Sequence, residues 1–580
     1  MAQSVAREQP EAVEEVSSFA KSLFRGSIPE QLVFPYPALG QGEAAKVREL
    51  LASLHEVAYD PWAAERDGWI GDDVVAELGE RGLLGLSVPE AYGGQGLSQT
   101  GYCRVAEDLG WLDATLAVVL GVHQSIGLKG IQLFGDDDQR ARFLPDLARG
   151  RRLAAFALTE PQAGSDAAAV TTRARREADG AWRLDGEKRW IGNGDRDVLV
   201  TFARIDEEDG GGHIALIVEG DQDGVSAPAR YRTLGLNANR LMRVRFDGVR
   251  VPPENVLGEP GEGFKIALRV LNNGRMALGT GALGGARRLL ELATAHTSER
   301  HQFGHPLADF ELVREKLSWI VTHSFGLESM AYLTTGLVDR GVSDYSVESA
   351  MVKVTATEFL WYAVNRVFQL AGGQAYIAGS PYEKMLRDVR VLPIFEGSND
   401  VLRLFVALSG CKPVADELRE LDSVKLADPI RSIGLLTEYV VGRLQREVRP
   451  ERITQAHASV AHLATPVSEQ VTRLRSTTES LLRTYRTGIT QRQWHLKRLA
   501  HAALDVYAQV ATISRVTQRL DEQGPDLAGR ERYLAEAFCT RAAARVDRQL
   551  RTVANNDDER TTNIATLTLE HRGYPTPLFT

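Results

Sequence analysis

The sequence predicts a mainly α-helical protein with a central β domain, because the spacing of apolar residues changes along the chain. In residues 1–150 and 256–410 apolar residues recur at three- and four-residue steps, as on amphipathic helices. Residues 151–255 alternate apolar and polar side chains between turn signals, which is typical of strands. Helical spacing returns over 411–580. We therefore expect an N-terminal helical domain, a middle β domain, a helical bundle and a C-terminal helical domain, in that order.

The clearest N-terminal helix is predicted at AAKVRELLASLHEVA, which carries an apolar stripe on one face. The stripe consists of Val47, Leu50, Leu51, Leu54 and Val57. The later segment VPEAYGGQG interrupts the helical pattern with proline and paired glycines.

In the β domain, Asp185-Gly186 lies between strand-forming residues and predicts a hairpin turn. The runs DVLVTFARI, HIALIVEG and MRVRFDGVRVP predict further strands.

The bundle begins with a long helical stretch, followed by helical tracts at 310–340, 345–371 and 397–409. Within the long stretch, Gly279, Gly281 and Gly284 match the dinucleotide-binding pattern GxGxxG. That pattern requires a preceding strand, which is missing here. The glycines therefore predict close helix packing.

A helix in the C-terminal domain is predicted to bury one face, formed by Val467, Val471, Leu474, Leu481, Leu482 and Tyr485. Its basic residues favour a solvated face over a contact with anionic membrane. They are Arg473, Arg475, Arg483 and Arg486.

Bulk composition excludes several classes of protein. The 580 residues carry a net charge of −9, which argues against a dedicated nucleic-acid binder. Cys103, Cys411 and Cys539 form no CxxC pair, so neither a disulfide framework nor a zinc site is expected. No apolar run reaches the length that spans a bilayer, and the first residues lack a signal-peptide core. We expect a soluble cytoplasmic protein.

Several segments could carry chemistry, although each is weak alone. They are FALTEPQAGSDAA, KRWIGNG, SERHQFG and QLAGGQAY. A further segment, PIFEGSNDVLRLF, places Glu396 just ahead of a helix. The residues suited to cap that helix are Ser398, Asn399 and Asp400, so capping does not explain Glu396.

Taken together and in this order, the motifs LTEPQAGSD, KRWIGNG, FDGVRVPPENVLGEPGEGFKIA, ERHQFG, QLAGGQAY and MLRDVRVLPIFEGSNDVLRLFVAL resemble the acyl-CoA dehydrogenase family over residues 30–410. VFPYP, HQSIGLKGI, LNNGR and the extra C-terminal helical region resemble its very-long-chain branch. The resemblance implies the acyl-CoA dehydrogenase fold: a helical domain, a β-barrel-like domain and a four-helix bundle, plus an appended helical domain.

The resemblance also implies a reaction, namely FAD-dependent α,β-dehydrogenation of a fatty acyl-CoA to the trans-2-enoyl-CoA. Electrons are expected to pass to an electron-transferring flavoprotein. The family's catalytic base falls on Glu396, whose apolar neighbours predict a desolvated carboxylate with a raised pKa. Some relatives take the base from the residue before Arg275, and here that residue is Gly274.

The resemblance assigns FAD contacts to Phe156, Leu158, Thr159, Ser165, Trp190, Gly192, Arg300, Phe303, Gln369, Gly373, Ser398 and Asp400. It assigns substrate contacts to Ser165, Arg275, Gly121 and Gly397. Two residues depart from the family pattern. Gly192 replaces a Thr or Ser beside the flavin, so a side-chain hydrogen bond is lost there. Ala375 replaces a Gly.

Gly121 and Gly127 match the stretch that closes the acyl pocket in shorter-chain relatives, so the resemblance implies that these small residues leave a deep slot for long-chain substrates. The branch also implies a homodimer and, in its mitochondrial members, peripheral membrane contact, for which 440–490 is the candidate stretch. Other functions stay open: a non-catalytic flavoprotein scaffold, an acyl-CoA oxidase, or a dehydrogenase of carrier-protein-bound acyl chains.

Overall fold

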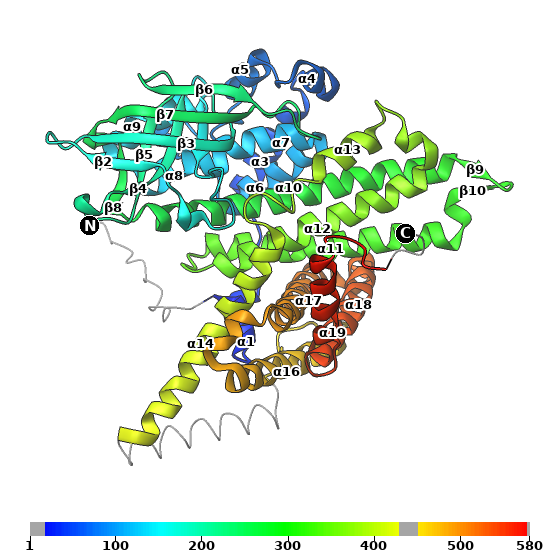
Figure 1. Cartoon of the computed structure of the whole chain (residues 1–580). Helices are drawn as coiled ribbons and strands as arrows, with labels where there is room; N and C mark the ends of the chain where they lie inside the picture. Colours follow the sequence, from blue (N-terminus) through cyan, green and yellow to red (C-terminus); the bar gives the residue numbers. More distant parts are fainter. Residues whose placement is uncertain (1–17, 428–450, 577–580) are drawn as a thin grey trace, which may run out of the picture. The chain divides into compact units, whose positions relative to one another are not determined.

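The computed structural model describes residues 18–427 and 451–576 (Figure 1). The chain divides into two compact units. The first includes Leu32–Leu402, and the second combines Phe19–Gln31 with the chain from Arg403 onward. The local sequence pattern does not predict that Phe19–Gln31 belongs to the same unit as the C-terminal part of the chain. The predicted mainly helical fold with a central sheet is confirmed.

Helices make up the N-terminal part of the first unit. They are α2 (Glu30–Val33), α3 (Gln41–His55), α4 (Pro61–Asp67), α5 (Asp72–Glu80), α6 (Gln99–Leu112), α7 (Ala114–Gly121), the π-helical turn η2 (Val122–Gly127), α8 (Leu128–Phe134) and α9 (Asp137–Ala148). Side-chain caps fix several starts: Asp113 accepts hydrogen bonds from backbone N–H groups of α7, and Asp136 forms a capping box on α9. In the predicted stripe on α3, Val47, Leu50 and Leu54 are buried.

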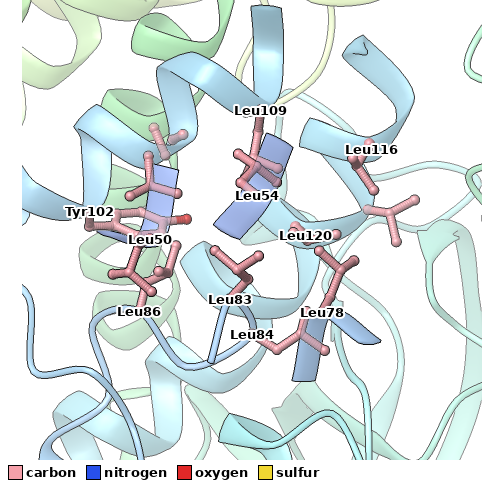
Figure 2. Close-up of a cluster of buried hydrophobic side chains, with 14 of the residues drawn as sticks. Leu50, Leu54, Leu78, Leu83, Leu84, Leu86, Tyr102, Leu109, Leu116 and Leu120 are labelled. Atoms are coloured by element: carbon pink, nitrogen blue, oxygen red, sulfur yellow. The ribbon is translucent and has the colours of Figure 1, made fainter. Parts of the chain in front are cut away.

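These helices share one apolar core. Figure 2 shows its leucines and Tyr102 pointing toward one another from several helices and from the turn that follows α5. The labelled members of this core are Leu50, Leu54, Leu78, Leu83, Leu84, Leu86, Tyr102, Leu109, Leu116 and Leu120.

The middle of the chain forms one eight-stranded sheet in the order β6-β7-β3-β2-β4-β5-β8, with β1 paired to β4. Its strands are β1 (Ala154–Ala157), β2 (Arg173–Arg176), β3 (Trp182–Gly192), β4 (Val198–Ile205), β5 (His213–Glu219), β6 (Val225–Arg230), β7 (Leu241–Val251) and β8 (Val256–Gly261). The sheet thus runs beyond residue 255, where the sequence places the end of the β domain.

The hairpin turn predicted at Asp185-Gly186 is wrong. Both residues lie inside β3, where the register with β7 shifts between Leu184 and Gly186. The side chain of Asp185 accepts a hydrogen bond from the backbone N–H of Gly248 on β7 at 2.7 Å. A glycine is needed here because a Cβ at Gly186 would lie 2.5 Å from Thr172 Oγ1. Asp-Gly therefore marks a bulge in a long strand.

The bundle of the first unit is built on α10 (Gly263–Glu299), which extends from the sheet along the other helices (Figure 1). It is followed by the small strands β9 (His301–Gln302) and β10 (His305–Pro306), then α11 (Glu311–Asp339), α12 (Ser346–Ala371), α13 (Pro381–Val389) and the first residues of α14 (Asn399–Ala427), which belongs to the second unit from Arg403 onward. The predicted glycine packing is confirmed: a Cβ at Gly284 would meet Glu107 O on α6 at 1.7 Å. A Cβ at Gly279 would meet Val352 Cγ1 on α12 at 2.5 Å.

The described helices of the second unit are α1 (Phe19–Phe24), α16 (Ala461–Tyr485), α17 (Gln493–Leu527), α18 (Gly529–Ala554) and α19 (Asp558–Glu570). The face predicted on α16 is buried from Val467 to Leu482. The expected solvated basic face is wrong for Arg475, because this side chain is buried and forms ion pairs with Glu479 and Glu417. Membrane contact through 440–490 stays a prediction, and residues 440–450 of that stretch lie outside the described residues.

One helical stretch, Ala114–Phe134, is long and apolar enough to cross a membrane, contrary to the expectation from sequence. Most of this stretch (78%) is buried inside the protein, as in the core helix of a globular protein. Cys103, Cys411 and Cys539 are buried and free.

Candidate active site

A cavity of about 260 Å³ lies within the first unit. Its wall comes from α6, α7, η2, α10, α13 and the loop that precedes α14. Most lining side chains are apolar or small, and Glu396 from the loop is among the few that can ionise. Tyr102, Leu109 and Leu120 belong both to this wall and to the core of Figure 2. The cavity is therefore a gap in a packed apolar region.

Small residues keep the cavity open. Gly121, at the end of α7, lines it, and a Cβ added there would meet only Ser125 Oγ, at 3.9 Å. The structure thus agrees with a slot beside Gly121. Gly127 does not line the cavity. It faces the sheet instead, where an added Cβ would lie 2.8 Å from the Cβ of Ala154 on β1. The close approach of η2 to the sheet explains why residue 127 is a glycine.

The wall next to the sheet is the π-helical turn η2, within the continuous helix from α7 to α8. Turns of this kind often mark functional sites. Val122, Ser125 and Ile126 of η2 face the cavity. The hydroxyl of Ser125 donates a hydrogen bond to the Gly121 carbonyl at 2.6 Å.

Glu396 presents a desolvated carboxylate to this cavity. Its Oε2 atom is buried and has no hydrogen-bond partner among the described residues. Burial raises the pKa of Glu396, whereas the positive charges of Arg275 and Lys353 act to lower it. An unpaired buried carboxylate is costly, and such groups are a frequent mark of chemistry.

The backbone of the loop is held in an uncommon conformation. Glu396 has φ 57° and Gly397 has φ 91°, so two consecutive residues are left-handed. The Nε of Arg275 donates to the Glu396 carbonyl at 3.2 Å. The Nζ of Lys353 donates to the Gly397 carbonyl at 2.8 Å. Cations from α10 and α12 thus fix two successive carbonyls. Arg275, predicted to contact substrate, contacts the Glu396 loop in this structure.

Gly274 lies directly beside the carboxylate. A Cβ at this position would lie 3.4 Å from Glu396 Oε2 and 2.8 Å from Ile126 Cγ2. A side chain at position 274 would therefore face the same point of the cavity as the Glu396 carboxylate. A glycine there leaves the space to Glu396.

The segments predicted to line a flavin lie at the ends of β1 and β3. The backbone N–H of Arg189 donates to the Thr159 carbonyl at 2.8 Å, which joins the two segments. Phe156 and Leu158 are buried in the core around β1 and β4. A Cβ at Gly192 would lie 3.1 Å from Val122 Cγ2, and Val122 lines the cavity. The ends of these strands therefore abut η2, the cavity wall next to the sheet.

These strand ends have the features of a site for a flat ring. The indole of Trp190 is 51% exposed although it belongs to a sheet, and its backbone is left-handed, with φ 60°. Near Gly192, Asn239 Oδ1 is buried and has no hydrogen-bond partner in the described structure. An exposed indole beside an unsatisfied polar atom fits a planar heterocycle with polar edges.

A buried ion pair ties these segments together. Lys188 on β3 and Glu160 are almost wholly buried, and Nζ lies 2.7 Å from Oε1. Lys188 also donates to the Leu158 carbonyl at 3.1 Å. Glu160 accepts hydrogen bonds from the backbone N–H groups of Thr171 and Thr172. These donors and Lys188 lower the pKa of Glu160 to about 2.

The remaining predicted FAD contacts are not brought to the cavity. Four of them lie exposed near the ends of α10 and α12: Arg300, Phe303, Gln369 and Gly373. Ser165 is exposed in the loop after β1. Ser398 and Asp400 stand at the start of α14, beside the Glu396 turn. The exposed fraction of Phe303 is 91%, which is unusual for a phenylalanine.

Two contributors to the site escape prediction from sequence. They are Lys353 and the side chain of Asn399, which accepts a hydrogen bond from Lys353 at 2.7 Å. The only available signal is a lysine inside the apolar run SAMVKVTA, because such a lysine must find partners when the helix is buried.

Comparison with known families agrees with this architecture. Residues 42–151, 155–249 and 261–410 match the family models of the acyl-CoA dehydrogenase N-terminal, middle and C-terminal domains. Residues 458–574 match the ACAD9/ACADV C-terminal domain.

Individual relatives extend over most of the chain. The mitochondrial very long-chain specific acyl-CoA dehydrogenase of Homo sapiens is 36% identical over 563 residues, covering 94% of this chain and 85% of the relative. A probable acyl-CoA dehydrogenase, FadE10, of Mycobacterium tuberculosis is 32% identical over 599 residues, covering 98% and 91%.

Solved structures show the same fold. An acyl-CoA dehydrogenase complexed with FAD, from Bacillus anthracis, superposes with a TM-score of 0.81 at 28% identity, covering 96% of both chains. Butyryl-CoA dehydrogenase from Megasphaera elsdenii gives 0.61 at 30% identity, covering 64% of this chain and 99% of that one.

The sheet and the bundle are thus those of a flavin-dependent oxidoreductase, and the chain belongs to the acyl-CoA dehydrogenase family. Its C-terminal domain and its relatives place it with the very-long-chain branch, as the sequence motifs predict. The family uses FAD, so the predicted cofactor is confirmed.

Proposed function

We propose that this protein catalyses the FAD-dependent α,β-dehydrogenation of long-chain fatty acyl-CoA, with Glu396 as the base. One observation carries the proposal: the Oε2 atom of Glu396 is buried without a hydrogen-bond partner among the described residues at an apolar cavity, and the strand ends suited to a flavin abut a wall of the same cavity.

Glu396 removes the proton from the α-carbon of the thioester. That proton is a weak acid, so the base must be desolvated and the substrate carbonyl polarised. Burial gives Glu396 a raised pKa and greater basicity, while Arg275 and Lys353 help to keep it ionised. The apolar wall excludes water from the carboxylate.

The loop also offers a donor for the thioester oxygen. No described residue accepts a hydrogen bond from the backbone N–H of Glu396. Because Arg275 and Lys353 fix the carbonyls of Glu396 and Gly397, this N–H is preorganised. A fixed N–H near the developing negative charge lowers the barrier to proton removal.

The residues of the first unit that would hold FAD are Thr159, Trp190 and Gly192 at the ring and Ser165 at the pyrophosphate. Ser398 and Asp400 would lie near the phosphates, where a helix start suits an anion. Arg300, Phe303, Gln369 and Gly373 would contact the cofactor of a partner subunit, which accounts for their exposure. Bound FAD would supply the acceptor for the hydride that leaves the β-carbon.

Long-chain substrates are supported by the open space beside Gly121 and by identity to very long-chain specific relatives. An electron-transferring flavoprotein is the proposed acceptor. In a solved structure of the electron transferring flavoprotein of Acidaminococcus fermentans, one chain is 30% identical to this one and superposes with a TM-score of 0.61. A cytoplasmic location stays a prediction.

Anaerobic titration of the purified yellow protein with acyl-CoAs of increasing length tests the proposal. We expect the flavin band to bleach, and to bleach fastest with long chains. Failure to bleach with every acyl-CoA would favour the non-catalytic scaffold. Peroxide formation in air without an added acceptor would indicate an oxidase, and bleaching only by carrier-protein thioesters would indicate a biosynthetic role. A preference for short chains would contradict the deep slot.

A further inference from the structure

Lys353 is an unusual residue in the middle of a buried helix. It lies on α12 with an exposed fraction of 0%, and its neighbours Val352 and Val354 are also buried. Burying an ammonium group is costly unless it is well bonded. Lys353 is nevertheless buried, and its ammonium group contacts the loop that carries Glu396.

The ammonium group binds the turn at two points that follow Glu396 in the chain. Nζ donates to the Gly397 carbonyl at 2.8 Å and to Asn399 Oδ1 at 2.7 Å. Asn399 is itself fixed, because its Nδ2 donates to Thr357 Oγ1 at 3.1 Å and its backbone N–H donates to the Pro393 carbonyl at 3.0 Å. The turn between Pro393 and Asn399 is therefore closed around Lys353.

The turn needs such support because its backbone is strained. A glutamate at φ 57° is in a region that side chains with a Cβ rarely occupy, and it persists only when the surroundings determine it. Arg275 supports the turn from α10 and Lys353 supports it from α12.

We propose that Lys353 is a positioning residue for the catalytic base, holding the carboxylate of Glu396 and the adjacent backbone N–H in reactive geometry through Gly397 and Asn399. The proposal rests on the proposed role of Glu396. Lys353 does not touch the cavity, so it acts through the loop and through its charge.

The charge of Lys353 gives the proposal a pH signature. Among the described groups, Arg275 on α10 and Lys353 on α12 are the charges that act on Glu396, and η2 contributes no ionisable side chain beside it. Both cations lower the pKa of Glu396. Without Lys353, only Arg275 would counter the effect of burial, so the pKa of Glu396 would rise and the carboxylate would ionise at higher pH.

The test compares K353M with wild type as holoenzymes, in anaerobic stopped-flow reduction by a long-chain acyl-CoA at several pH values. We expect flavin reduction to slow by about 10- to 100-fold, since small displacements of a catalytic group have effects of that size. We also expect little change in substrate affinity and a shift of the acid limb to higher pH. K353R, which keeps the charge and donors, should recover part of the rate.

A matched control is K129M. Lys129 is also buried in the first unit, but its ammonium binds Ser87 and Gln132, away from the base loop. The K129M variant should retain the wild-type rate and pH profile. If K353M does not fold, N399S, which weakens the same link more gently, is judged by the same readouts.

Wild-type rate and acid limb in folded K353M would overturn the proposal. E396Q, measured in parallel, separates this outcome from failure of the proposed function. An inactive E396Q beside a fully active K353M would leave Glu396 as the base and remove Lys353 from its support. A fully active E396Q would remove the base itself.

Discussion

At the residue scale, Glu396 shows how surroundings give an ordinary carboxylate a chemical task. Its neighbours Ile394 and Phe395 and its position before a helix already suggest an unusual role in the sequence. The structure adds the physical reason, because Oε2 is buried without a partner and Gly274 leaves the facing space empty. The sequence could not show the supporting cations, because Arg275 and Lys353 are distant from Glu396 in the chain.

A substitution at Gly121 tests the slot. The residue has ordinary helical geometry, and a Cβ there meets nothing closer than 3.9 Å, so G121L should fold. The new side chain would occupy the cavity and lower kcat/KM for long-chain substrates by about 10- to 200-fold. Activity on short chains should change little.

Steady-state kinetics over a chain-length series, with G121A as the smaller replacement, provides the measurement. Equal losses for short and long chains would mean that the acyl group does not pass Gly121.

At the element scale, the ends of β1 and β3 are held by Lys188 and Glu160. Sequence alone indicates strands here, but it misreads Asp185-Gly186 as a hairpin. Asp-Gly suits both a two-residue turn and a bulge, and only the pairing partner, β7, decides between them. Local patterns thus predict which element forms more reliably than they predict which element it pairs with.

The Lys188–Glu160 pair predicts a pH-dependent stability. Since the pKa of Glu160 is lowered from 4.5 to about 2, its stabilising effect is fully present above pH 4.5 and is lost as the pH falls through about 2. E160Q leaves Lys188 buried without its counter-charge and should cost about 3–5 kcal/mol near neutral pH.

Denaturant titrations of E160Q and wild type, followed by circular dichroism between neutral pH and about pH 2, check this result. The difference between them should shrink as the solution becomes acidic. E207Q is the control, because Glu207 forms only an exposed ion pair with Arg204. An E160Q protein as stable as E207Q would show that the pair contributes nothing.

At the scale of the whole molecule, the sequence predicts the order of helical and β regions, and the structure and the family models agree with that order. It does not predict that Phe19–Gln31 belongs with the C-terminal unit. Glu30 contributes to that association, because its carboxylate accepts hydrogen bonds from the backbone N–H and the hydroxyl of Thr454, both at 2.7 Å. Contacts between residues this far apart leave no periodic signal in the sequence.

The exposed Phe303 and the exposed FAD-contact candidates beside it predict assembly. A phenylalanine that is 91% exposed needs a covering partner, and a second copy of the chain would supply both the cover and the missing cofactor contacts. We expect sedimentation equilibrium to give twice the chain mass of 63.7 kDa. A single-chain mass, with FAD bound and activity intact, would contradict this assembly.

The central claim is that Glu396 is the base, and rapid anaerobic mixing of E396Q with a long-chain acyl-CoA tests it most directly. E396Q keeps the shape and removes the charge, so it should purify with FAD and bind substrate. Its flavin reduction should be slower than wild type by at least about 10²- to 10⁴-fold. Reduction at the wild-type rate would contradict the account, because the α-proton would then leave to another group.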